Sequence, residues 1–163
     1  MSSFNSLNSK LPGRNWILLQ CVLAQRTASL ARLRFHLVET LVRWRVVHLY
    51  GYVSCLASAS VTYWSPFSCS NYPGLGAYAG VTITTAGNTV LLPPKQLSLS
   101  SGWSFIPGYD GQSTELVLTK FSDQPVAVTS GQELRLWYSE DLMNGPEDDN
   151  GGRSCCDVYA IFE

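Results

Sequence analysis

From residue 61 onward the chain consists of short stretches in which apolar and polar residues alternate, separated by Gly, Pro, Asn or Ser. Alternation places successive side chains on opposite faces of a strand, so each stretch predicts a half-buried β-strand. No stretch here shows the period of an amphipathic helix. Strands at this spacing predict an all-β fold, an antiparallel β-sandwich or jelly-roll-like domain. The expected strands are residues 78–85, 88–92, 95–100, 103–106, 115–121, 125–129, 133–139 and 155–162.

Charge divides the chain into two unlike parts. Residues 1–60 hold seven Lys or Arg and one acid, whereas residues 61–163 hold four Lys or Arg and eleven acids. We therefore expect a folded domain at residues 60–163, preceded by a non-domain leader at residues 1–59 with helical and apolar character. An excess of acids repels phosphate, so nucleic acid is not an expected partner of the domain.

The leader has three recognisable parts. Residues 1–13 are rich in Ser and Asn, which predicts a disordered start. Residues 26–47 mix Arg with apolar residues at roughly helical spacing, which predicts a basic amphipathic helix. Residues 46–59 are uncharged, follow two arginines and end in Ala-Ser-Ala, the pattern of a secretory signal peptide. The alternatives are a partly buried segment, or a membrane anchor if residues 46–64 are retained.

The five cysteines show no zinc-site spacing. Cys155 and Cys156 are adjacent, and a bridge between neighbours strains the peptide that joins them. We therefore predict a disulfide from Cys69 to Cys155 or Cys156, as expected of an extracellular protein. The alternative is that all the thiols are small buried side chains in a reducing compartment.

Residue types argue against an enzyme. Both histidines, His36 and His48, fall within the expected leader, so the domain lacks the base of a Ser-His or Cys-His site. No nucleophile elbow or phosphate-binding loop occurs, and no catalytic residue is predicted. The remaining enzymatic alternative is a remnant of a secreted glycoside-active enzyme, with Glu115 or Glu133 paired with Glu140.

An acidic loop between the last two expected strands is the candidate metal site. Calcium prefers several carboxylate and amide oxygens on a Gly-containing loop, which residues 140–152 offer. The candidate ligands are Glu140, Asp141, Asn144, Glu147, Asp148, Asp149 and Asn150. The alternatives are a solvated turn, or a loop held by Arg135 and Arg153.

Aromatic residues give a second candidate site. Trp103, Tyr109 and Trp137 are the candidate ligand-binding residues, because an exposed aromatic face stacks on a sugar ring. The alternative is that they pack in the core or across strands. Trp137 lies on the strand face opposite Leu134 and Leu136, so it is either exposed or in a second core.

The segments LWYSEDL, DNGG and CDVYA resemble a C-terminal β-module of secreted multidomain matrix and adhesion proteins of marine invertebrates, over about residues 80–163. That module has one cysteine before DVYA, whereas two stand here. The resemblance implies an extracellular location. We therefore expect a secreted, non-enzymatic binding or matrix module, with calcium at residues 140–152 and an extracellular protein or glycan as partner. The alternative is a carbohydrate-binding, lectin-like module.

Overall fold

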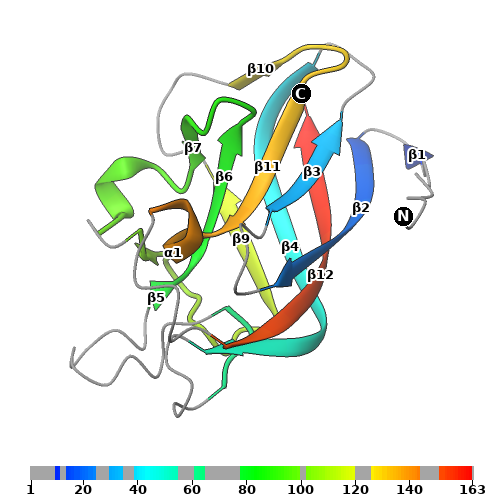
Figure 1. The fold of residues 1–163 in the computed structure, drawn as a ribbon. Coiled ribbons are helices and arrows are strands. Elements are labelled where there is room, and N and C mark those ends of the chain that lie inside the picture. Colours follow the sequence, from blue (N-terminus) through cyan, green and yellow to red (C-terminus); the bar gives the residue numbers. More distant parts are fainter. Residues whose placement is uncertain are drawn as a thin grey trace.

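Two antiparallel sheets pack face to face in the computed structural model, with a two-stranded sheet beside them (Figure 1). The structure describes residues 10–11, 14–24, 30–34, 39–54, 61–64, 78–99, 102–119, 126–143 and 151–162. The antiparallel β-sandwich expected from the alternating pattern is confirmed. Within the described residues, no helix is long and apolar enough to cross a membrane.

The larger sheet has six strands. Their order is β1 (Lys10–Leu11), β2 (Arg14–Ala24), β12 (Gly151–Phe162), β4 (Glu39–Ser54) and β10 (Val126–Val128), and β9 (Glu115–Thr119) also pairs with β4. Every neighbouring pair is antiparallel. The long strands β4 and β12 run side by side through the middle of this sheet (Figure 1).

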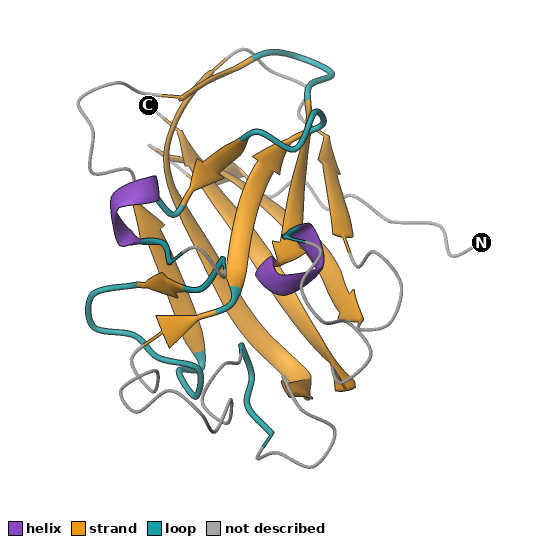
Figure 2. Ribbon diagram, turned by 60° about the vertical axis from the view of Figure 1, so that its left-hand side comes forward, coloured by secondary structure: helices purple, strands orange, loops and turns teal. Residues whose placement is uncertain are grey.

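The smaller sheet has four strands, and the helical segments are short. The order is β3 (Leu30–Arg34), β11 (Glu133–Tyr138), β6 (Val81–Thr85) and β7 (Val90–Leu92). The two-stranded sheet pairs β5 (Tyr78–Ala79) with β8 (Ser104–Phe105). The helical segments are η2 (Lys95–Leu97) and α1 (Ser139–Leu142), drawn in purple in Figure 2.

The core lies between the two large sheets and follows the alternation of the strands. In β9, Leu116 and Leu118 are buried, while Glu115, Val117 and Thr119 are partly exposed. The larger sheet contributes Trp44, Val46, Leu116, Leu118, Cys156, Val158 and Ala160, and the smaller sheet Val81, Ile83, Leu92, Leu134 and Leu136. Full burial of each large apolar side chain contributes about 1.5–3 kcal/mol to the stability of the fold. Both sheets are therefore stabilised by packing against each other.

Two expectations for the first third of the chain are wrong. Residues expected as a basic helix form β3 and most of β4, and the signal-like run continues β4 to Ser54. Trp44 and Val46 are fully buried, while Arg43 is exposed and Arg45 partly so, which is strand alternation. Within this run Val46 and Val47 pair with both β12 and β9, and the residues from His48 to Ser54 run along β12. The segment at residues 39–54 is therefore part of the domain, and the boundary expected at residue 60 is misplaced.

Two smaller expectations also change. Part of the expected disordered start, Lys10–Leu11, pairs with β2, and residues 1–9 and 12–13 lie outside the described residues. The strand expected at residues 95–100 begins as the turn η2, with Pro94 at its N-cap. Two prolines precede this turn, and a proline has no N–H to donate to a ladder.

Candidate functional site

The three aromatic residues proposed from the sequence do not form an exposed platform. Trp103 is 6% exposed and Trp137 is 5% exposed, and Tyr109 packs against the core. The indole Nε1 of Trp137 donates a hydrogen bond to Thr84 Oγ1 at 2.9 Å. Trp137 thus belongs to a second buried layer on the outer side of the smaller sheet, the second of the two alternatives stated for it.

Only two of the seven candidate calcium ligands lie within the described residues. Asp141 is buried in α1, and Glu140 accepts a hydrogen bond from the Tyr138 hydroxyl at 3.3 Å. Asn144, Glu147, Asp148, Asp149 and Asn150 lie outside them. No group of three or more His, Cys, Asp or Glu side chains suited to a metal occurs in the described part of the chain. Calcium binding at residues 140–152 stays a prediction.

Exposed aromatic residues occur instead on β4. Tyr50 is 65% exposed and Tyr52 is 51% exposed, the two largest values among the big hydrophobic side chains of the described residues. They are two residues apart, and they pair with Cys155 and Arg153 of β12. We call Tyr50 and Tyr52 the tyrosine ledge. The ledge is absent from the sites expected from the sequence because its segment has the pattern of a leader, although Tyr-Gly-Tyr within an apolar run is a signal for an irregular strand.

A β-bulge and two glycines shape the strands beneath the ledge. The register between β4 and β12 shifts between Cys155 and Cys156. Gly51 and Gly152 have positive φ angles of 85° and 92°. A Cβ on Gly51 would lie 2.1 Å from the backbone oxygen of Arg153, and a Cβ on Gly152 would lie 2.3 Å from that of Tyr52. Only glycine permits this close backbone approach, and bulges of this kind redirect side chains near binding sites.

His48 supports the bulge from the other side. Its Nε2 lies 2.8 Å from the Gly51 carbonyl oxygen, so the nitrogen that faces this oxygen carries the proton. The imidazole ring stacks on Tyr63, with ring centroids 3.9 Å apart. His48 is thus a structural neighbour of the ledge. Its ring is held by a backbone carbonyl and an aromatic face.

The cysteines next to the ledge differ in state. Cys155 is a free, buried thiol, and its hydrogen bond with the hydroxyl of Tyr50 raises the pKa of Tyr50. Cys156 is disulfide-bonded and faces the core, and its partner is not among the described side chains. Cys155 is therefore not the bridging residue, and the alternative bridge from Cys69 to Cys156 stays a prediction. Cys69 lies outside the described residues, so its part in the bridge stays a prediction.

Charged side chains continue the outer face of the larger sheet beyond the ledge. The Arg45 Nε donates to Glu115 Oε2 at 2.7 Å, and the Arg45 guanidinium lies 5.8 Å from the ring centre of Tyr159. Burial raises the pKa of Asp157, and its Oδ1 has no hydrogen-bond partner among the described residues. The face thus offers aromatic rings beside cations, which suits stacking and hydrogen bonding to a polar ligand.

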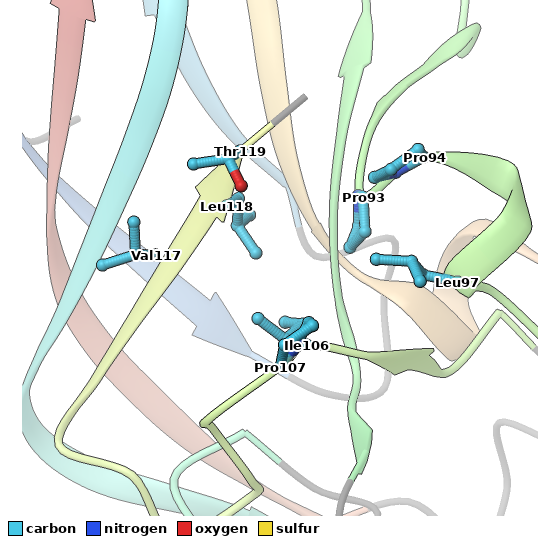
Figure 3. Close-up of a pocket in the computed structure, with 8 residues that line it drawn as sticks. All are labelled: Pro93, Pro94, Leu97, Ile106, Pro107, Val117, Leu118 and Thr119. Carbon is cyan, nitrogen blue, oxygen red and sulfur yellow. The ribbon is translucent and has the colours of Figure 1, made fainter. Parts of the chain in front are cut away.

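A small pocket lies between the edges of the two sheets, beside β9 (Figure 3). Its volume is about 50 Å³. The lining residues are Pro93, Pro94, Leu97, Ile106, Pro107, Val117, Leu118 and Thr119. Ligand sites for small molecules are typically several hundred Å³ and include convergent polar groups. This pocket is too small and too apolar to hold a sugar ring.

Comparison with known proteins identifies a structural neighbour. The chain resembles AJLec, a lectin from the sea anemone Anthopleura japonica, with a TM-score of 0.71 and 26% sequence identity. The similarity covers 99% of this chain and 98% of that one, so residues 1–59 are included in it. No family model and no curated protein matches the sequence. The chain therefore shares its fold, over its whole length, with a sea anemone lectin.

Proposed function

We propose that the protein is a carbohydrate-binding module and that the tyrosine ledge is its sugar-binding surface. The observation that carries the proposal is the similarity to AJLec over the whole chain. This favours the lectin-like alternative over the protein-binding matrix module that the sequence suggested first. The exposed rings of Tyr50 and Tyr52 supply its location.

The ledge has the chemistry that sugar recognition requires. A tyrosine ring stacks on the apolar C–H face of a sugar, while its hydroxyl and a neighbouring arginine bond to the sugar oxygens. Tyr52 pairs with Arg153 and Tyr50 with Cys155. The bulge and the glycines hold the two strands in one arrangement, which lowers the ordering cost of binding.

An extracellular location accords with this function. Cys156 is disulfide-bonded, and disulfides persist in oxidising compartments. A glycan outside the cell is the expected partner. Three further expectations stay predictions. They are the resemblance to matrix modules of marine invertebrates, the absence of enzymatic activity and the binding of calcium.

A glycan array tests the proposal. The full-length chain, produced under oxidising conditions, should bind a defined set of glycans. Tyr50→Ala and Tyr52→Ala should each weaken binding to those glycans about three- to tenfold, because an aromatic contact contributes roughly 0.5–1.5 kcal/mol. Phe105→Ala is the matched control, since Phe105 is an exposed aromatic residue at 41% exposure on the two-stranded sheet.

Three results are informative. Loss of binding in both tyrosine variants with unchanged melting temperatures supports the ledge. Equal binding by the tyrosine variants and the wild type would move the sugar site elsewhere on the fold. An array without any binding would overturn the lectin-like function and return the matrix-module alternative to first place.

A further inference from the structure

The tyrosine ledge is one end of a longer row of aromatic and basic side chains. On the outer face of the larger sheet, Tyr52 pairs with Arg153, and Arg45 pairs with Tyr159. These residues alternate with the core residues of β4 and β12, so they share one face. The row, which we call the arginine–tyrosine strip, comprises Arg43, Arg45, Tyr50, Tyr52, Arg153 and Tyr159.

Two arginines of the strip are available to a ligand. Arg43 and Arg153 are exposed, and neither forms an ion pair with another described residue. Arg45 bonds to Glu115 and also lies over the ring of Tyr159. An exposed guanidinium presents a rigid fork of donors that matches a carboxylate, and the same fork suits a sulfate.

Two acids of the described strands lie near the strip. The carboxylate of Glu115 already accepts from Arg45. Asp157 lies between the tyrosines of β12 and β4, and burial raises the pKa of its carboxyl group. Arg153, beside Tyr52, and Arg43, beyond Tyr159, therefore stand at the two ends of the strip.

We propose that the arginine–tyrosine strip binds an acidic oligosaccharide, with sulfate or carboxylate groups on Arg43 and Arg153 and sugar rings on the tyrosines. This inference rests on the proposed carbohydrate-binding function and specifies its ligand class. From Arg43 to Tyr52 a strand extends about 30 Å at 3.3 Å per residue. A ligand that reaches both arginines is thus an oligosaccharide rather than a single sugar.

Single-stranded nucleic acid also combines anionic groups with rings that stack on tyrosine. The chain as a whole carries a net charge of −1, and residues 61–163 carry an excess of acids. An extended polyanion such as nucleic acid gains much of its affinity from a net positive surface, which the chain as a whole does not have. A short acidic glycan needs only the cations of the strip, so we favour the glycan.

Calorimetric titration of the full-length protein with four probes tests the inference. The probes are chitohexaose, hyaluronan hexasaccharide, chondroitin sulfate hexasaccharide and the oligonucleotide dT12. We expect one of the two acidic hexasaccharides to bind more tightly than neutral chitohexaose. The double variant Arg43→Gln/Arg153→Gln should weaken that binding about tenfold or more, because a hydrogen bond to a charged group contributes about 1.5–3 kcal/mol.

Lys95→Gln is the charge control, because Lys95 is exposed in η2, outside the strip, and its loss removes one of the two positive charges that the double variant removes. This variant should bind like the wild type. If it loses as much affinity as the arginine variant, overall charge explains the binding and the strip is excluded.

The outcomes separate the inference from the function on which it rests. Equal or tighter binding of chitohexaose, still weakened by Tyr52→Ala, would overturn the acidic ligand and leave the sugar-binding function standing. Tighter binding of dT12 would overturn the glycan in favour of nucleic acid. If no probe binds and the glycan array is also empty, both proposals fail together.

Discussion

Gly51 and Gly152 determine the shape of the candidate site because they lie on adjacent strands and each approaches the backbone of the other strand. A Cβ at either position would overlap a carbonyl oxygen, at 2.1 Å for Gly51 and 2.3 Å for Gly152. Both residues also have positive φ, where an L-residue is strained. The local path of β4 and β12 thus depends on the absence of a side chain at both glycines. The direction of the Tyr50 and Tyr52 side chains follows from that path.

Replacing either glycine by alanine should therefore be severely destabilising. We expect Gly51→Ala and Gly152→Ala to lower the free energy of unfolding by about 3 kcal/mol or more, since a backbone clash adds to the positive-φ cost. Gly108→Ala is the control, because Gly108 has a φ of 84° but no atom within 4 Å of its Cβ position. Gly108→Ala should lower the free energy of unfolding by only about 1–2 kcal/mol. Urea denaturation measures all three, and equal losses would show that the close approach contributes nothing.

Among the elements, β4 shows best where sequence patterns are ambiguous. Its arginines before an uncharged run resemble the start of a signal peptide, and the same arginines alternate with Trp44 and Val46 as the outer face of a strand. A short run satisfies both patterns, and only the pairing with β9 and β12 decides between them. From residue 61 onward, turn residues bound each run, and the alternation of β9 and β11 was sufficient to predict those strands.

The candidate site was less predictable than the fold for the same reason. The exposure of Trp103 and Trp137 depends on which other segment covers them, and alternation does not encode this. The tyrosine ledge depends on a bulge that pairs residues about a hundred positions apart in the sequence. Long-range register of this kind is not visible in any single stretch.

The loop after α1 is the element on which the calcium prediction rests. If residues 140–152 bind calcium, added calcium should raise the melting temperature and a chelator should lower it, because a ligand of the native state alone stabilises that state. Glu147→Gln and Asp149→Asn should remove the shift by deleting carboxylate ligands. Magnesium at the same concentration is the control, since it favours a smaller octahedral site. Scanning calorimetry without any calcium-dependent shift would reduce the loop to a solvated turn.

At the scale of the whole molecule, β4 makes the first and last thirds of the chain one folding unit. It pairs with β9, β10 and β12, and it supplies Trp44 and Val46 to the core shared with the smaller sheet. β12 in turn has β2 as its other neighbour. The similarity to AJLec over 99% of the chain agrees with a single unit of this extent.

A fragment of residues 60–163 should therefore not fold. Without β2 and β4, β12 loses both of its neighbours and β9 loses its partner, so their apolar faces would be exposed to water. We expect this fragment to lack a cooperative thermal transition, followed by circular dichroism. The full chain with Trp44→Ala is the control for loss of core contacts alone, and it should stay folded but lose about 3–5 kcal/mol. Adding a peptide of residues 1–59 to the fragment should restore a transition, because the missing strands return to the sheet. A cooperative transition in the fragment alone would mean that residues 1–59 are dispensable for folding, contrary to the role of β4 in the core.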